Sequence, residues 1–185
     1  MSLTSATSLT AYCDNYRAKY SASRKSVTGF GIMLRGSPIS WKSKKQTIVA
    51  RSTVEPEYQA IATTTCEVTW LLSLFKDLGL SDLAPALWKC DNQTALCIVA
   101  NLVFHERMKH IKIDCHFIRE KMQDGIIHPT YVSTKAQLAD IFTKIVSIAQ
   151  HNLLLSKLGV LNLFSPPTLR GGVGNTANRE EEVQG

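Results

Sequence analysis

The stretch Ser52-Thr-Val-Glu-Pro-Glu-Tyr-Gln-Ala-Ile-Ala62 opens the longest helical pattern of the chain, which runs on to Leu78 and Gly79. Ser52 followed three residues later by Glu55 is a capping-box signature, and a glycine after the last periodic residue is typical of a helix end. Small and apolar side chains recur at three- and four-residue steps within it: Tyr58, Ile61, Ala62, Thr65, Val68, Leu72 and Phe75. Because this spacing places them on one face, the sequence predicts a long helix packed against a core.

Glu57 is unusual because it lies one turn before Ile61 and shares the predicted buried face. Burying a carboxylate without a partner is costly, so the position calls for an explanation. Three ordinary explanations stay open. Glu57 interacts favourably with the helix dipole in the first turn, pairs with a lysine, or is solvated at the rim of the core. A role in a functional site is the fourth, and it depends on which other acids lie nearby.

Length and composition indicate one globular domain. The chain has 185 residues, of which 44% are hydrophobic and 19% are charged, and its net charge of +6 favours a polyanionic partner weakly. Five scattered cysteines without a Cys-x-x-Cys pair indicate reduced core thiols in an intracellular protein. Neither a secretory signal nor an apolar run of membrane-spanning length is visible, so no membrane partner is expected.

The order of the predicted elements indicates an α/β fold with a mixed five-stranded sheet flanked by helices. Strands are expected at 10–14, 27–35, 39–41, 86–91 and 126–132, the second and third forming a hairpin and the last an edge strand because of Pro129. Further helices are expected at 93–100, 107–123 and 134–158. The domain is predicted to cover residues 10–164, after an N-terminal extension (1–9) and before a disordered tail (165–185).

Four acids fall at ends of these elements that can converge: Asp14, Glu57, Asp91 and Asp140. Asp140 is expected between one and two turns into the last helix. Two carboxylates about 5 Å apart at an effective dielectric of about 20 repel by roughly 3 kcal/mol, so such a cluster needs a proton or a cation. Hard divalent ions, Mg²⁺ above all, suit oxygen ligands, and a pair of them can activate water against a phosphodiester.

Several stretches then resemble the ribonuclease H region of the Pol polyprotein of copia-type LTR retrotransposons of plants. They are Arg24-Lys25-Ser26, Ser40-Trp41-Lys42-Ser43-Lys44-Lys45-Gln46, residues 50–58, Cys90-Asp91-Asn92-Gln93-Thr94-Ala95, residues 105–111 and 114–119, and Gln137-Leu138-Ala139-Asp140-Ile141-Phe142-Thr143-Lys144. The resemblance covers about residues 12–164 in the right order. It implies a ribonuclease H-like fold and metal-dependent cleavage of the RNA strand of RNA–DNA hybrids during reverse transcription.

By match of motif, the resemblance makes Asp14, Glu57, Asp91 and Asp140 both catalytic residues and ligands of two Mg²⁺ ions, for which Mn²⁺ can substitute. It implies an RNA–DNA hybrid as substrate, the reverse transcriptase part of the same polyprotein as a partner, and a location in a cytoplasmic virus-like particle or in the nucleus. Asn92, Gln93 and Ser52 are candidates for sensing the 2′-OH of RNA. Lys42, Lys44, Lys45 and Arg51 are candidate phosphate contacts, with a solvated basic loop as the alternative.

The chain departs from the family beside the first aspartate. Family members carry Asp-x-Asp-Trp there, whereas this sequence has Tyr16 and Arg17 at the third and fourth places, with Lys19 nearby. A catalytically decayed remnant that only binds nucleic acid is therefore the main alternative. An integrase-type transferase is rejected, because the spacing of its third acid falls on Ile126. A zinc site at His105, His110 and His116 is not expected without cysteine pairs, and the three tryptophans are expected in the core.

Overall fold

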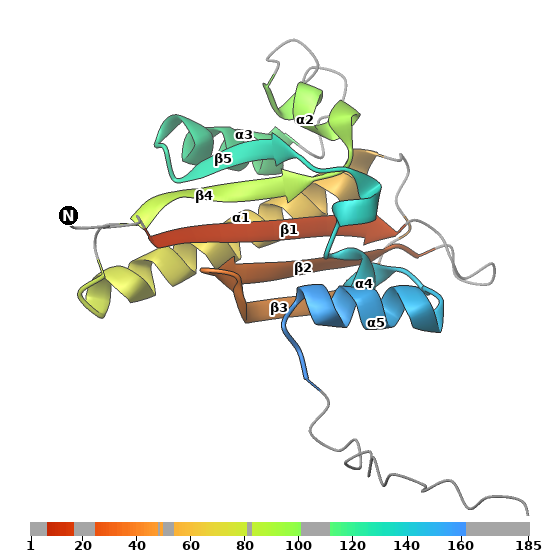
Figure 1. Ribbon diagram of the computed structural model, residues 1–185. Helices are drawn as coiled ribbons and strands as arrows, with labels where there is room; N and C mark the ends of the chain where they lie inside the picture. Colours follow the sequence, from red (N-terminus) through yellow and green to blue (C-terminus); the bar gives the residue numbers. More distant parts are fainter. Residues whose placement is uncertain are drawn as a thin grey trace, which may run out of the picture.

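The five-stranded mixed sheet predicted from the sequence is confirmed (Figure 1). A computed structural model describes residues 7–16, 25–47, 49, 54–80, 83–100 and 112–161. The strands are β1 (Thr7–Tyr16), β2 (Val27–Leu34), β3 (Ser37–Lys45), β4 (Leu83–Cys90) and β5 (Ile127–Tyr131), in the spatial order β3-β2-β1-β4-β5. The first three strands are antiparallel neighbours, whereas β4 runs parallel to β1 and β5 runs parallel to β4.

The β2–β3 hairpin turns at two residues, Arg35 and Gly36, with φ of 51° and 83°. Positive φ at both turn positions matches the twist of the flanking strands. β3 continues to Lys45, so the basic run, which lies beyond the strand expected at 39–41, is part of that strand. β1 likewise begins at Thr7 and includes Asn15 and Tyr16, which were expected outside it. In both cases pairing with β2 extends the strand beyond what its own polar sequence indicates.

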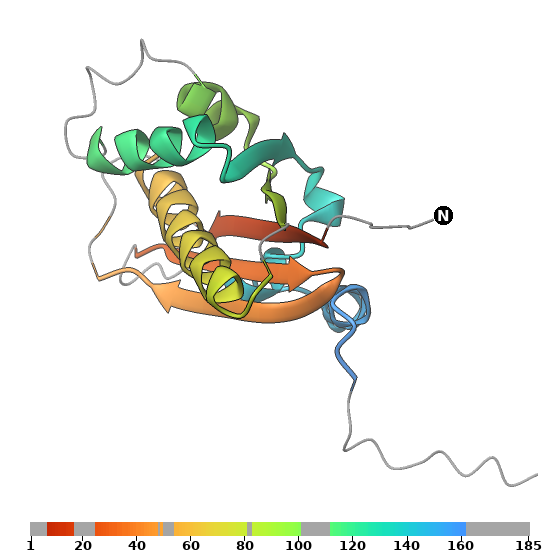
Figure 2. The ribbon, with the colours of Figure 1, turned by 90° about the vertical axis from the view of Figure 1, so that its left-hand side faces the viewer.

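Helix α1 (Val54–Asp77) covers one face of the sheet together with α3 (Lys112–Gln123), as the two views of the ribbon show (Figures 1 and 2). The buried face of α1 is confirmed: Tyr58, Ile61, Thr65 and Val68 have no exposed surface. Trp88 of β4 lies in the same core, but Trp41 and Trp70 are 60% and 57% exposed. The expectation that all three tryptophans are core residues is therefore wrong for two of them.

The C-terminal part does not form the single helix expected over residues 134–158. It consists of a 3₁₀ turn η2 (Thr134–Ala136), the short helix α4 (Asp140–Thr143) and helix α5 (Ile148–Lys157). Gln137 and Lys144 have extended backbones with ψ of 104° and 147°, which interrupt the helix. Gln137 is fully buried and its Nε2 donates to the Cys13 carbonyl at 2.9 Å, so a contact with β1 replaces helical continuity.

Helix α4 lies against β2 on the face opposite α1, where two glycines leave room for it. A Cβ atom at Gly29 would come within 2.7 Å of Phe142 Cβ and 2.8 Å of Thr143 Cγ2, and one at Gly31 within 2.9 Å of Phe142 Cε2. Ser43 of β3 donates to the Phe142 carbonyl at 2.6 Å. Since real Cβ atoms do not approach other atoms so closely, the close approach of α4 depends on glycine at these positions.

β5 and α2 are a strand and a helix, as the sequence predicts for these positions. β5 carries Pro129 at the edge of the sheet, as expected, and α2 (Gln93–Ala100) begins where the Asn92 side chain accepts from the Ala95 N–H at 3.0 Å. Within the described ranges, no helix combines the length and apolar character needed to cross a lipid bilayer. Residues 1–6, the loop with Arg17 and Lys19, Ser52, His105, His110 and the tail 165–185 lie outside the described residues.

We expect Gly29→Ala to lower the free energy of unfolding by about 2 kcal/mol, because the Phe142 Cβ that blocks it is fixed to the α4 backbone. Gly31→Ala should have a smaller effect, since the ring atom it meets is the far end of a side chain that can rotate. Urea unfolding followed by circular dichroism measures both. Equal effects at the two positions would show that α4 does not depend on close contact with Gly29.

Candidate active site

Three of the four predicted acids converge at one end of the sheet. The parallel register pairs Tyr12 of β1 with Lys89 of β4, so two residues further on Asp14 lies beside Asp91, which directly follows the last residue of β4. Asp140 begins α4, which packs on the same end of β1 and β2. Carboxylate oxygens of Asp14, Asp91 and Asp140 all lie within 4.8 Å of one another. The convergence expected from the sequence is confirmed for these three.

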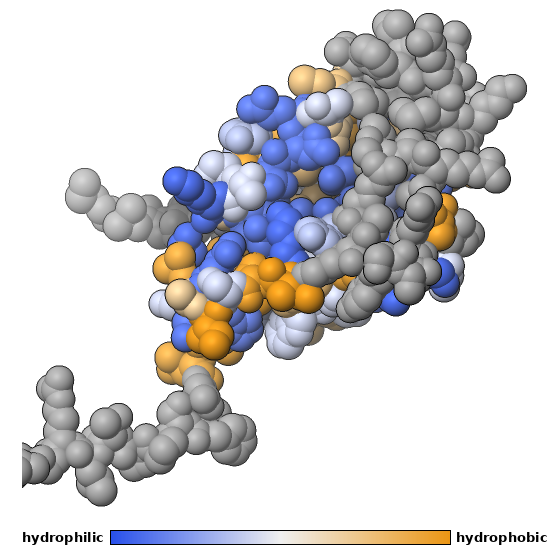
Figure 3. Space-filling model, turned by 90° about the vertical axis from the view of Figure 1, so that its right-hand side faces the viewer, coloured by the Kyte–Doolittle hydropathy of each residue, from blue (hydrophilic) through white to orange (hydrophobic). Residues whose placement is uncertain are grey.

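Glu57, the fourth acid, lies in the first turn of α1, at the same end of the sheet as the other three acids. It lines an open hollow of about 510 Å³ together with Asp14, Asn15, Asp91, Asn92, Gln93, Tyr131 and Lys144. Figure 3 looks onto the face where β1 and β4 end and shows mainly hydrophilic residues across its middle. The lining is thus polar and open, as a site for a large charged ligand requires, unlike the closed apolar pockets that hold small molecules.

The surroundings of Glu57 decide between the explanations left open by the sequence. The pKa of Glu57 is raised to about 7, mainly by burial and also by the neighbouring Asp14 and Asp91, while hydrogen bonds with Asn92 and Asn15 oppose the shift. Within the part of the chain that the structure describes, its partners are therefore two amides and no lysine. A carboxylate in this position is held close to other carboxylates, and a cation in the hollow would favour its charged form.

Asp14 and Asp140 are the most buried members of the site, at 4% and 2% exposed. Burial raises the pKa of both. The Thr143 hydroxyl donates to Asp14 Oδ2, and the Lys144 ammonium lies 2.6 Å from Asp140 Oδ1 and 3.5 Å from Asp14 Oδ1. Burial alone would lower the pKa of Lys144, but its hydrogen bond to Asp140 and the charge of Asp14 raise it, so Lys144 stays a cation.

Sequence reasoning assigned no role to three residues that lie in this site: Asn15, Thr143 and Lys144. Of these, only Lys144 could have been predicted from the sequence, because an aspartate followed four residues later by a lysine forms a favourable pair in a helix. Thr143 and Asn15 reach the acids through the docking of α4 and the extension of β1, neither of which local sequence indicates. Tyr131, at the end of β5, was likewise not expected to line the site.

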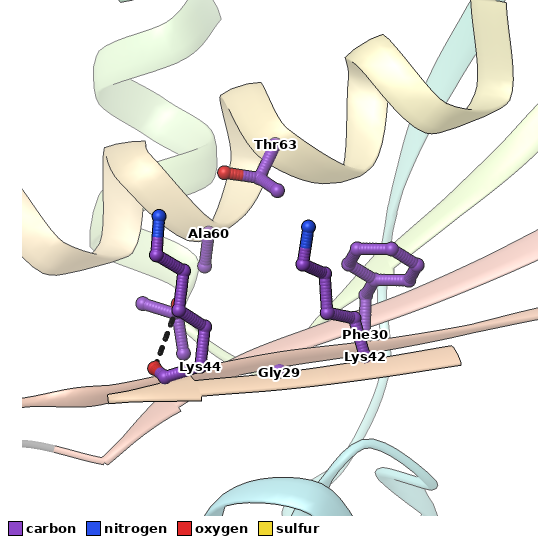
Figure 4. A pocket seen from close by; sticks show the side chains of 7 residues that line it. Gly29, Phe30, Lys42, Lys44, Ala60 and Thr63 are labelled. Carbon is purple, nitrogen blue, oxygen red and sulfur yellow. Dashed lines mark hydrogen bonds between the residues drawn. The ribbon is translucent and has the colours of Figure 1, made fainter. Parts of the chain in front are cut away.

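The predicted nucleic-acid contacts fall into two groups. Asn92 and Gln93 line the hollow itself. Lys42 and Lys44 are exposed on β3 and point towards the α1 side of the sheet, beside Thr63 (Figure 4). Lys45 is exposed at the end of β3, while Arg51 and Ser52 lie outside the described residues. The lysines and the hollow are thus separate surfaces of the same end of the molecule.

The donor set of the site fits hard divalent cations. Its ligand atoms are carboxylate oxygens, with amide groups of Asn15, Asn92 and Gln93 nearby, and none of the described residues lining the hollow is a histidine or a cysteine. Among the described residues, Asp14, Asp91 and Asp140 are the one group of three possible ligands brought together in this way. Oxygen ligands of this kind suit Mg²⁺ and Mn²⁺.

The chain is similar in sequence to polyproteins of plant transposons. It is 44% identical over 161 residues to the retrovirus-related Pol polyprotein from transposon RE1 of Arabidopsis thaliana, and 42% identical over 164 residues to that from transposon RE2. The corresponding polyprotein from transposon TNT 1-94 of Nicotiana tabacum is 36% identical over 152 residues. These alignments cover 82–89% of this chain but 11% of each polyprotein, so the chain spans about a ninth of their length. No protein-family model matches.

Solved structures show which fold this is. The N-terminal ribonuclease H domain of a Mycobacterium tuberculosis protein matches with a TM-score of 0.53 at 8% identity, covering 81% of this chain and 97% of that one. A ribonuclease H1 isolated from compost matches with a TM-score of 0.56 at 14% identity, covering 74% and 92%, and has also been solved in complex with an RNA/DNA hybrid. The ribonuclease H-like fold expected from the sequence is confirmed.

The raised pKa of Glu57 predicts that the metal-free protein becomes less stable as pH rises. A carboxyl group with a folded-state pKa of about 7 and an ordinary value of 4.5 stabilises the fold fully below the lower value. This contribution, at most about 3 kcal/mol, is lost as pH rises through the higher value. We expect urea unfolding in EDTA to show this decline between about pH 5 and about pH 8, and Glu57→Gln to flatten it.

Glu55→Gln, in the same turn of α1, is the matched control for this measurement. It should keep the decline of stability between about pH 5 and about pH 8, because Glu57 is intact in it. A Glu57→Gln variant whose stability falls with pH as steeply as that of the parent protein would mean that Glu57 is not held among other carboxylates.

Proposed function

Since the chain belongs to the family of retrovirus-related Pol polyproteins of plant transposons, of which it covers a segment with the ribonuclease H fold, we propose that it is a ribonuclease H. Its reaction would be the hydrolysis of the RNA strand of an RNA–DNA hybrid. Water attacks the phosphorus atom, the bond to the 3′-oxygen breaks, and the products carry a 5′-phosphate and a 3′-hydroxyl.

The observation that carries this proposal is the convergence of four carboxylates from four separate elements. Asp14 comes from β1, Glu57 from α1, Asp91 from the end of β4 and Asp140 from α4. A core does not need such a cluster, because like charges in a partly buried place lower stability. Its persistence in a fold shared with ribonucleases H supports a cation-binding catalytic centre at this position.

Two divalent cations held there would supply Lewis-acid polarisation of the phosphate, an activated water and charge stabilisation of the leaving oxygen. Asp14 is oriented by the Thr143 hydroxyl, and its charge acts on both Glu57 and Asp140, so it is the candidate to contact both ions. Glu57, Asp91 and Asp140 would complete the ligand set. Asn92 and Asn15 hold Glu57 in place through their hydrogen bonds.

Discrimination of RNA from DNA would depend on polar groups beside the acids. Asn92 and Gln93 line the hollow at the start of α2, together with the acids. Their amides can both donate to and accept from a 2′-hydroxyl, which DNA lacks. Ser52 was predicted for the same role, and that prediction stays untested.

The hybrid would extend from the acids across β2 to β3. Asp14 pairs with Gly29, and Gly29 pairs with Ser43, which Lys42 and Lys44 flank. Neighbouring strands lie about 4.8 Å apart, so β3 is about 10 Å from the strand that carries Asp14. Lys42 and Lys44 would therefore contact phosphates other than the scissile one, and the net charge of +6 favours a polyanion.

The alternative is a decayed domain that binds hybrid without cutting it, suggested by Tyr16 and Arg17. Tyr16 is the last residue of β1, paired with Val27, and the strand still presents Asp14 to the other acids. The altered motif therefore leaves the carboxylate geometry intact, which favours the enzyme. In a longer polyprotein, a reverse transcriptase segment would be the partner, in a virus-like particle or the nucleus.

We expect the purified protein to cut the labelled RNA strand of a hybrid with Mg²⁺ or Mn²⁺ and to lose this activity in EDTA. Asp91→Asn should reduce the rate by at least about a hundredfold, because it removes a metal ligand. Asp77→Asn, at the end of α1, is the matched control and should cut like the parent protein. Hybrid binding without cleavage in either metal would contradict the proposed enzyme and support the decayed domain.

Replacing Lys42 and Lys44 with glutamine should weaken hybrid binding uniformly across sequences. The slope of log Kd against log salt concentration should become less steep by about 2, one unit for each lost phosphate contact. The binding is best measured by fluorescence anisotropy in an Asp91→Asn background, so that the RNA stays intact. Lys76→Gln, exposed at the end of α1, should leave the slope unchanged. An unchanged slope in the double variant would place the hybrid elsewhere.

A further inference from the structure

One cation of the chain itself already lies among the acids. Lys144 follows α4 directly, and its ammonium is 2.6 Å from Asp140 Oδ1 and 3.5 Å from Asp14 Oδ1. Its side chain is 24% exposed and lines the hollow that the acids share. The lysine therefore reaches the carboxylates from the open side, where a cation from solvent would also enter.

The position of Lys144 is determined by the helix that carries Asp140. Its backbone N–H closes α4 by donating to the Asp140 carbonyl at 2.8 Å, and the chain then leaves in an extended conformation. Asp140 and Lys144 are thus four residues apart on one helical turn, the favourable order for an ion pair. The same helix consequently brings both a carboxylate and its neutralising charge to Asp14.

Lys144 and a divalent cation would make competing demands on the same oxygens. The ammonium contacts Asp140 Oδ1 and lies close to Asp14 Oδ1, and both carboxylates belong to the group that can hold a metal. A metal with short bonds to these oxygens must push the ammonium aside, because two cations sharing one oxygen repel each other. Without a metal, the ammonium of Lys144 is a positive charge that offsets the repulsion among the acids.

We propose that Lys144 is a resident counter-ion, which holds the acidic cluster together in the metal-free protein and is displaced when a divalent cation binds. This inference rests on the proposed function, since it assumes that the cluster binds metal. It assigns Lys144 two opposite effects: it stabilises the metal-free fold and weakens metal binding. A lysine that only strengthens the structure would have the first effect and not the second.

The test compares Lys144→Met with Lys121→Met in the full 185-residue chain. Lys121 of α3 is the matched control, because it also contacts two carboxylates, Glu120 at 2.8 Å and Asp124 at 3.6 Å, and is 17% exposed, but lies away from the hollow. Methionine keeps the length of the lysine side chain and removes its charge. Lys144→Arg keeps the charge and should behave like the parent protein in both measurements.

Isothermal titration calorimetry with MnCl₂ should show about tenfold tighter binding for Lys144→Met than for the parent protein, because no resident charge has to be displaced. In EDTA the same variant should unfold about 3 °C lower, and saturating MnCl₂ should remove that difference. A variant that is unfolded in EDTA and folds on addition of MnCl₂ gives the same result in a stronger form. Lys121→Met should bind MnCl₂ like the parent protein.

Equal or weaker Mn²⁺ binding by Lys144→Met, or a loss of stability that persists in saturating MnCl₂, would overturn the inference and leave Lys144 as a structural ion pair. These outcomes are distinct from failure of the proposed function. If the parent protein binds no Mn²⁺ at all, the metal-dependent enzyme fails together with the inference. If it binds Mn²⁺ and cuts hybrid but Lys144→Met binds no tighter, the inference alone fails.

Discussion

The candidate site depends on how closely helix α4 can approach strand β2. The absence of side chains at Gly29 and Gly31 lets Phe142 and Thr143 lie directly on the strand, and Gln137 anchors the preceding turn to the Cys13 carbonyl of β1. This contact brings Asp140 within reach of Asp14, to which Gly29 is also paired. A helix displaced by the size of one methyl group would separate the acids, so packing and chemistry depend on the same contact.

The second constraint is the concentration of like charge that this packing creates. Burial and mutual repulsion raise the pKa values of Asp14, Glu57 and Asp140. Neighbouring hydrogen-bond donors and one lysine counteract this repulsion. The Thr143 hydroxyl and the Asn92 and Asn15 amides donate hydrogen bonds, and Lys144 supplies a positive charge. The acids thus form a local negative site in a chain whose net charge is +6, a combination that suits a polyanion bound through cations.

Local sequence predicted the elements whose residues bury a continuous face. The periodicity of α1, the hairpin, Pro129 on an edge strand and the cap at Asn92 all agree with the structure. The last helix was predicted wrongly, because the pattern after Thr134 is helical by propensity while the Gln137 side chain bonds to β1 instead. Trp41 and Trp70 were misplaced for a similar reason: hydrophobicity indicates a core residue, but only the layers of the fold decide which faces are covered.

The sequence by itself determined the fold class and the family and singled out the four acids as candidates, because strand ends, helix starts and motif order are local properties of the chain. Only the tertiary structure decided that Asp14, Asp91 and Asp140 lie within 4.8 Å of one another and that Lys144, Thr143 and Asn15 belong with them. The reason is physical. Convergence depends on strand register, which pairs Tyr12 with Lys89, and on the glycine contact beneath α4, which joins Gly29 to Phe142, and both link residues far apart in the chain.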